Sequence, residues 1–232
     1  MTADTDRKNG AQHVYAKLKH LVVNYRIAPG KHLHPSEFVN SLKVSATPIR
    51  DAMHRLSGEQ LLVFVPSKGF FSKVLDLTEM RELLELEFAL IQHALATSHF
   101  RSELTIKIES EFGVDLQNIG CFCSVSDRLF ERIAARSGNH CLTRLLMNLI
   151  DRTHYVGVLD FEEEGRRSDA AKQLQAFLAD LSAHRISGAI ETLQHFLQNK
   201  VDRLPELVKE GLARSHRLSK CSAVAFEGVI EF

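Results

Sequence analysis

The order of short segments between residues 13 and 74 constrains the fold of this chain more than any other feature. Apolar residues at helical spacing predict a helix over 13–25, and a proline and a glycine end it soon afterwards. A short helix is expected from Pro35, because the missing N–H of proline costs nothing in a first turn. A turn at 43–45 then leads into a further helix, with Ser45 in the N-cap region. These segments predict three helices, the last two of which are joined by a tight turn.

A hairpin with a positively charged tip is predicted after the third helix. Residues 61–65 and 70–74 have β-like composition, and the turn between them carries Lys68 and Gly69. Three helices followed by such a hairpin are typical of a winged helix-turn-helix. The last helix of this fold is narrow enough for the major groove of DNA, where its N-terminal residues meet base edges.

Charge is divided unevenly along a chain that is neutral as a whole, with 29 Lys and Arg against 29 Asp and Glu. Residues 1–75 hold 11 basic and 5 acidic residues, a net +6, so residues 76–232 hold 18 and 24, a net −6. Four of the five prolines also precede Leu75. We therefore expect two domains, a DNA-binding domain over 1–75 and an acidic domain over 76–232.

Residues 13–74 also resemble the DNA-binding domain of GntR-family bacterial transcription regulators. The matching stretches are Ile27-Ala28-Pro29-Gly30-Lys31, Val44-Ser45-Ala46-Thr47-Pro48-Ile49-Arg50-Asp51-Ala52-Met53-His54-Arg55-Leu56 and Gly69-Phe70-Phe71. The resemblance implies that six residues touch DNA: Ser45, Thr47, Arg50, Lys68, Gly69 and, near the backbone, Arg55. Arginine can bond guanine through two donors, whereas hydroxyls serve bases or phosphates. The family often has arginine where this chain has Ala46, so one potential contact is lost. The alternative is that Arg50 and Arg55 form an ordinary solvated helix face.

From residue 76 the pattern is helical almost throughout and predicts an all-α bundle. Helices are expected at about 77–99, 102–112, 126–136, 141–157, 169–184 and 188–200. Loops are expected at 113–123 and in the strongly charged segment 160–167, and a tail from Pro205. In the first of these helices, Leu86 is expected in the core. The fold class is therefore mainly α, a winged helix-turn-helix followed by a helical ligand-sensing bundle.

The bundle resembles, over residues 77–200, the ligand-sensing FCD domain of the FadR-type branch of the family. The stretches that carry this resemblance are Asp127-Arg128-Leu129-Phe130-Glu131 and Ala135-Arg136-Ser137-Gly138-Asn139. Many members of this branch hold a divalent metal with one Asp and three His. Asp127 matches the Asp, whereas the three His positions fall on Glu131, Leu174 and Phe196. Because Leu and Phe cannot ligate a metal, we expect no metal cofactor and a more apolar pocket. A helix shift that uses His184 or His195 is the alternative.

The effector pocket implied by this resemblance comprises five residues: Asp127, Glu131, Arg152, Leu174 and Phe196. The family tends to place Arg and Glu near the centre of the first bundle helix, where this chain has Glu87 and Ile91. Because arginine pairs with carboxylates, its loss argues against a simple carboxylic acid as the effector. Arg132, Arg152 and His154 are the cationic candidates that remain, with surface or interhelix roles as the alternative.

Together these patterns predict a transcription regulator, not an enzyme, that binds a near-palindromic operator in double-stranded DNA as a homodimer. A small-molecule effector bound in the C-terminal bundle is expected to modulate DNA affinity. A ligand-independent DNA-binding or architectural protein is the main alternative. A helical metal-dependent enzyme is the least favoured, because the sequence has no Gly-rich phosphate loop, no GxSxG and no HExxH.

The sequence also bears on location. No apolar run approaches the roughly 18 to 20 residues that span a bilayer. The first residues have no apolar signal-peptide core. The 4 cysteines are too few and too scattered for a disulfide scaffold. We therefore expect a cytoplasmic protein with no membrane partner.

Overall fold

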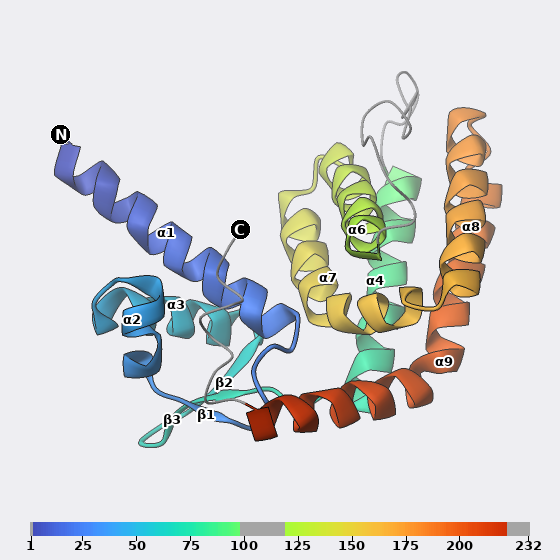
Figure 1. The fold of residues 1–232 in the computed structure, drawn as a ribbon. Helices are drawn as coiled ribbons and strands as arrows, with labels where there is room; N and C mark the ends of the chain where they lie inside the picture. Colours follow the sequence, from blue (N-terminus) through green and yellow to red (C-terminus); the bar gives the residue numbers. More distant parts are fainter. Residues whose placement is uncertain (1, 98–118, 222–232) are drawn as a thin grey trace. The chain divides into compact units, whose positions relative to one another are not determined.

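The computed structural model describes residues 2–97 and 119–221, whose helices and strands are shown in Figure 1. This part of the chain is mainly helical and has one small sheet. It divides into two compact units: an N-terminal unit, up to Leu75 together with the chain from Lys209, and a C-terminal unit, Asp76–Val208. The division after Leu75 coincides with the change in charge. The chain from Lys209 groups with the N-terminal unit, although the sequence predicted one C-terminal domain over 76–232.

The N-terminal unit has the predicted order of helices and strands. Its elements up to Leu75 are α1 (Thr2–Val23), β1 (His32–Leu33), the 3₁₀ helix η1 (Pro35–Phe38), α2 (Val39–Leu42), α3 (Ala46–Gly58), β2 (Leu62–Val65) and β3 (Gly69–Ser72). The fold class is thereby confirmed. Two details differ, because α1 begins well before residue 13 and the two-residue strand β1 is too short to show any alternation in the sequence.

The three strands form an antiparallel sheet in the order β1-β3-β2. Ser72 at the end of β3 is buried, and its hydroxyl donates to the carbonyl of Ala28 and accepts from the backbone N–H of Lys31 at 3.0 Å. Backbone bonds from Gly30 N to Ser72 O and from Ser72 N to Lys31 O reinforce this junction. The loop after α1 is therefore fastened to the sheet, because its polar backbone groups are satisfied there.

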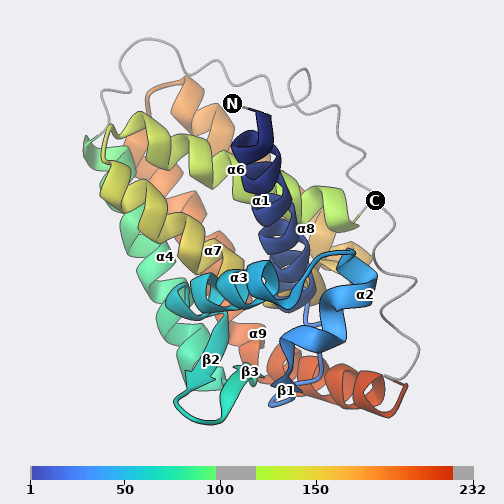
Figure 2. The ribbon, with the colours of Figure 1, turned by 90° about the vertical axis from the view of Figure 1, so that its left-hand side faces the viewer.

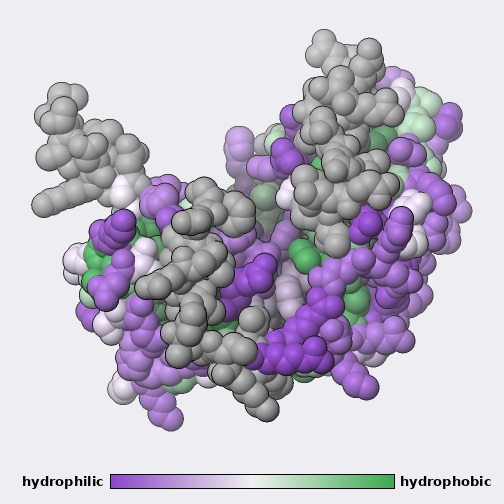
Figure 3. Space-filling model, viewed as in Figure 1, coloured by the Kyte–Doolittle hydropathy of each residue, from purple (hydrophilic) through white to green (hydrophobic). Residues whose placement is uncertain are grey.

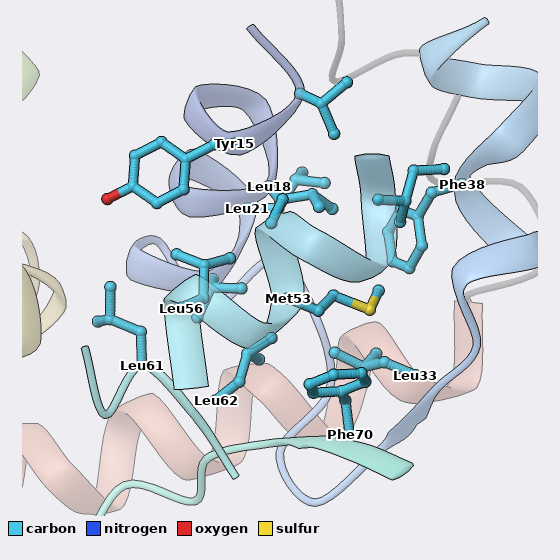
Figure 4. Packing of buried hydrophobic residues seen from close by; sticks show 14 of the residues in the cluster. Tyr15, Leu18, Leu21, Leu33, Phe38, Met53, Leu56, Leu61, Leu62 and Phe70 are labelled. Atoms are coloured by element: carbon cyan, nitrogen blue, oxygen red, sulfur yellow. The ribbon is translucent and has the colours of Figure 1, made fainter. Parts of the chain in front are cut away.

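An apolar core joins α3 to α1 and to the sheet. Ile49, Met53 and Leu56 recur at helical spacing on α3 and have no measurable exposure. Figure 4 shows Met53 and Leu56 among side chains of α1 and the sheet, including Leu18 and Phe70. The two helices lie against each other, as Figure 2 shows. This packing fixes which face of α3 is left for solvent.

The described C-terminal unit is helical throughout. Its elements are α4 (Leu77–Thr97), α6 (Ile119–Arg136), α7 (His140–Phe161), α8 (Glu164–Ser182) and α9 (Ile186–Cys221), whose last part belongs to the N-terminal unit. The helix predicted at 102–112 lies outside the described residues. The loop predicted at 113–123 is wrong over 119–123, which form the first turn of α6. Buried Phe122 and Cys123 explain this, since both face the interior at that end of the helix.

The charged segment 160–167 is only in part the solvated loop that the sequence predicted, because residues 162–165 are exposed whereas Asp160 and Arg167 are buried. Asp160 has no exposed surface, and its carboxylate accepts from Arg166 at 3.2 Å and from Arg203 at 2.7 Å. Arg167 is buried and donates to the carbonyl of Phe161 at 2.9 Å. Because a buried charge is stable only when it is paired, this segment fastens α7 to α8 and α9.

The predicted tail from Pro205 is also wrong, because α9 continues through this proline to Cys221. Leu204, Leu207 and Val208 around it are buried, whereas Pro205 itself is exposed. Burial of this apolar face outweighs the single backbone hydrogen bond that a proline removes from a helix.

Hydrophilic residues cover most of the described surface in the view of Figure 3. Large apolar side chains that stay exposed are Val63, Phe64, Val74, Leu86 and Leu145. The prediction of Leu86 in the core is wrong, since it is 43% exposed and its neighbour Glu87 is buried instead. None of the helices described here is long and apolar enough to cross a membrane.

Candidate nucleic-acid interface and interior polar cluster

The exposed face of α3 carries the polar side chains that the sequence singled out. Thr47, Arg50 and His54 are spaced by three and four residues, so they lie on one face, opposite the buried face of the helix. Arg50 has no hydrogen bond or ion pair with any described residue, so its guanidinium is open to a ligand. Ser45 occupies the N-cap position without a side-chain cap bond, and its exposed hydroxyl is likewise open.

The hairpin between β2 and β3 presents Lys68 at its tip. Its turn needs the left-handed conformation, with φ of 65° at Ser67 and 94° at Gly69. A Cβ on Gly69 would meet Nε2 of His32 at 3.0 Å, and the His32 ring stacks on Phe71 with 4.7 Å between ring centroids. Gly69 is therefore required both by its backbone angle and by the close approach of His32. The result is a rigid wing with an exposed lysine.

His54 connects the exposed face of α3 to the wing. Its ring centroid lies 5.1 Å from that of Phe64 on β2 and 4.7 Å from that of Phe70 on β3. His54 is not among the DNA-binding residues predicted from the sequence. Its spacing of four residues from Arg50 was the signal that could have identified it.

Arg55 lies apart from Thr47, Arg50 and His54. It follows His54 by one residue, a rotation of about 100° on a helix, which turns it towards α1. Its guanidinium carbon lies 3.5 Å from the centroid of the Tyr15 ring, and its Nε donates to Glu59 at 3.2 Å. The predicted DNA contacts therefore lie in three places: the solvent-exposed face of α3 with its N-cap, the wing, and the junction of α3 with α1.

The five residues predicted for the effector pocket differ in burial and in their partners. Asp127 on α6 is half-buried and its Oδ2 lies 3.0 Å from Nδ1 of His154 on α7, whereas Glu131 is exposed. Arg152 pairs with Glu79 in the first turn of α4. The two remaining residues, Leu174 on α8 and Phe196 on α9, are buried.

A cluster of polar side chains lies inside the C-terminal unit. This interior polar cluster comprises Glu87 on α4, Asp127 on α6, Thr153 and His154 on α7, and Lys200 on α9. The hydroxyl of Thr153 donates to Oε2 of Glu87 at 3.1 Å. Burial raises the pKa of Glu87, and the charge of Asp127 raises it further, while Lys200 acts in the opposite direction. The cluster therefore couples charges from four helices.

Lys200 is the buried cation of this cluster. It is 8% exposed and forms no salt bridge with a described residue. Its Nζ lies 5.5 Å and 5.6 Å from the centroids of Phe161 and Phe196, which stabilise an ammonium through their ring faces. Burial raises the pKa of the nearby Cys123 thiol to about 12, with Asp127 raising and Lys200 lowering it. Glu87 and Lys200 are not among the site residues predicted from the sequence, because neither belongs to a recognisable motif.

The structure places the residues expected at the metal positions of the FCD branch in different surroundings. Across residues 2–97 and 119–221, no three or more His, Cys, Asp or Glu side chains are grouped as metal ligands. His195, the shifted alternative, is exposed, and so is His184. Asp127 is instead engaged by His154, and the ammonium of Lys200 supplies positive charge to the same interior.

A basic wing, an open recognition helix and a fastened three-strand sheet define a winged helix-turn-helix DNA-binding protein. Comparison with known proteins agrees, because residues 10–71 match the family model described as bacterial regulatory proteins, gntR family. The N-terminal unit is thus similar to the DNA-binding domains of that family, and the chain is a DNA-binding transcription regulator rather than an enzyme.

Individual relatives extend the similarity over most of the chain. The Nta operon transcriptional regulator of Aminobacter aminovorans is 24% identical over 195 residues, covering 82% of this chain and 91% of the relative. The HTH-type regulator YdhC of Bacillus subtilis is 22% identical over 209 residues, covering 85% and 92%. Among solved structures, E. coli McbR/YncC has a TM-score of 0.64 at 21% identity, over 85% of this chain and 97% of that one. A GntR structure from Rhodococcus sp. RHA1 has a TM-score of 0.66 at 13% identity, over 84% and 97%. The structural similarities support the fold of both units.

Proposed function

We propose that the protein binds a near-palindromic operator by placing the exposed face of α3 in the major groove, while Lys68 of the wing contacts the flanking backbone. The observation that carries this proposal is the open row of Thr47, Arg50 and His54 on α3. Arginine at such a position bonds two acceptors of guanine, which gives sequence preference.

The test is an anisotropy titration of the full chain against an operator selected from random duplex DNA. Arg50→Ala should weaken operator binding by about 1–3 kcal/mol and relax sequence choice. Arg81→Ala is the matched control, because Arg81 is an exposed arginine on α4 of the C-terminal unit. Equal affinity of the Arg50 variant and the wild type would refute the placement of α3.

We also propose that two copies bind together, since a single short recognition helix reads only a few base pairs. Leu86 on α4 and Leu145 on α7 are 43% and 45% exposed, and these two helices pack against each other. Exposed leucines on adjacent helices are suited to contacts between copies. Sedimentation should give a dimer for the wild type and a weakened dimer for Leu145→Glu. An unaltered dimer in that variant would exclude this face.

We further propose that the C-terminal unit belongs to the FCD type and responds to a small-molecule effector. The interior polar cluster supports this proposal, because a buried Glu87 and a buried Lys200 are costly for stability and suit a binding role. Binding can alter DNA affinity only if the effector prefers one arrangement of the protein.

A metabolite screen monitored by melting temperature tests the effector proposal. A compound that raises the melting temperature should also change operator affinity, and Lys200→Met should remove both effects. Operator affinity that no stabilising compound alters would favour the ligand-independent alternative. We propose that this response takes place in the cytoplasm and needs no resident metal. Because no metal is needed, a chelator should leave operator affinity unchanged, and metal analysis of the purified chain should find no stoichiometric metal.

A further inference from the structure

Arg55 is held in place by three residues at the junction of α3 and α1. Its guanidinium stacks on the Tyr15 ring, its Nε donates to Oε1 of Glu59 at 3.2 Å, and its Nη1 donates to Oε1 of Gln12 at 3.1 Å. Tyr15 and Gln12 come from α1, and Glu59 follows the last residue of α3. Even so, about half of the Arg55 side chain, 51%, is exposed.

Tyr15 fixes the position of Glu59 in turn. Its hydroxyl donates to both carboxylate oxygens of Glu59, at 2.9 and 2.7 Å. A tyrosine hydroxyl keeps its proton at neutral pH, and burial raises the pKa of Tyr15 further. In Figure 4 the Tyr15 ring lies at the edge of the apolar cluster with its oxygen directed away from the other labelled side chains. The cluster therefore anchors a tyrosine whose polar end reaches Glu59.

These bonds leave donors available on the outer side of the junction. Arg55 uses Nε and Nη1 within the described chain, so Nη2 is open to a further acceptor. Gln12 accepts through Oε1, which leaves the two N–H groups of its amide, and its side chain is exposed. An arginine that is already ordered loses less side-chain freedom when it binds an anion.

We propose that Tyr15 and Glu59 are positioning residues that hold Arg55 ready for one DNA backbone phosphate, with the Gln12 amide as a second donor to that phosphate. This inference rests on the proposed contact of Arg55 with DNA and adds how that contact is prepared. A phosphate oxygen accepts from Nη2 without breaking the bonds to Glu59 or the stack on Tyr15. The negative charge of Glu59 repels the phosphate, which by itself would weaken DNA binding. Because the positioning of Arg55 outweighs this repulsion, loss of Glu59 should weaken DNA binding.

The test is a double-mutant cycle on operator affinity with the full chain: wild type, Arg55→Ala, Glu59→Ala and the double variant. Arg55→Ala should weaken binding about tenfold and lower the salt slope by about 0.9, as expected for one lost phosphate contact. Glu59→Ala should weaken binding severalfold in the wild-type background, but should not weaken it in the Arg55→Ala background, where only the repulsion between Glu59 and the phosphate is left. Melting temperatures of all four proteins exclude a general loss of folding.

Two results would overturn the proposal. If Glu59→Ala tightens binding in the wild-type background, Glu59 acts only as a repulsive charge. If it weakens binding equally in both backgrounds, its role is structural. Wild-type affinity and an unchanged salt slope for Arg55→Ala would instead refute the DNA contact of Arg55 itself, which separates the two claims.

Two substitutions at Tyr15 separate the contribution of its ring, which stacks on Arg55, from that of its hydroxyl, which binds Glu59. Tyr15→Phe keeps a ring beneath Arg55 and removes only the bond to Glu59, so a small loss of operator affinity is expected. Tyr15→Leu removes the stack as well and should cost more. Both losses should disappear in the Arg55→Ala background, and their persistence there would contradict the positioning role. Gln12→Ala should weaken binding without changing the melting temperature, and unaltered affinity would remove Gln12 from the phosphate site.

Discussion

The two units of the molecule differ in what their interiors contain. Up to Leu75, the described core is apolar, and Ser72 is its buried polar residue, bound to backbone groups. The C-terminal unit instead buries the charged side chains of Glu87, Asp160, Arg167 and Lys200. An apolar core needs only packing to be stable, whereas buried charges need partners at fixed positions.

We propose that this difference corresponds to two ways of binding. Up to Leu75, the described Asp, Glu, Lys and Arg side chains are not buried, and an open Arg50 and Lys68 can meet a polyanion. The C-terminal unit keeps charged side chains in its interior. Polar groups of the proposed effector could pair with these buried charges. Substitutions on the surface of the N-terminal unit and in the interior of the C-terminal unit should therefore have different effects on DNA affinity and on stability.

The largest effect is expected at Asp160. Asp160→Ala leaves Arg166 and Arg203 without their buried partner and should lower the free energy of unfolding by about 3–5 kcal/mol. Asp169→Ala, which breaks an exposed pair with Lys172, is the control and should cost less than about 1 kcal/mol. Denaturant unfolding measures both, and similar values for the two variants would contradict the distinction between the interiors.

A core truncation in the N-terminal unit should cost nearly as much for another reason. Met53 has no exposed surface, so Met53→Ala leaves a cavity and should destabilise by about 2–5 kcal/mol. Asp51→Ala, on the exposed side of the same helix, is the control. Denaturant unfolding is again the measurement, and a negligible cost for Met53→Ala would show that α3 does not pack as described.

The wing lysine should have a smaller effect that is specific to charge. Lys68→Ala should weaken specific and nonspecific duplexes alike and make the dependence of log affinity on log salt shallower by about 0.9. Titrations at several salt concentrations give this slope. An unchanged slope would exclude a phosphate contact from the tip of the wing.

The smallest effect is expected from pH at Glu87. Because burial raises the folded-state pKa of Glu87, the folded chain holds this proton more tightly than the unfolded chain. The stabilisation is present below the ordinary glutamate pKa, about 4.3, and is lost as pH rises through the folded-state pKa. Glu87→Gln should therefore match the wild type at low pH and exceed its stability at neutral pH. Unfolding curves across pH measure this, and an advantage confined to low pH would contradict the sign.

Local signals in the sequence predicted the N-terminal unit well. Its turns depend on prolines and glycines, and the exposed row on α3 follows from helical spacing around Ile49 and Met53. The helical class of the second unit was also predictable. The burial of Glu87 and Lys200 was not, because tertiary packing decides which side of an amphipathic helix faces the interior. The continuation of α9 through Pro205 depends likewise on packing that a local rule does not include.

Placement of α3 in the major groove is the central claim, and guanine N7 methylation tests it most directly. A full-chain complex on its selected operator should protect a guanine in each half-site, because the guanidinium of Arg50 covers N7 and O6. The Arg50→Ala complex, formed at a concentration that saturates the DNA, should leave these guanines reactive. Protection that is identical in the two complexes, or no protection of any guanine by the wild type, would contradict the account.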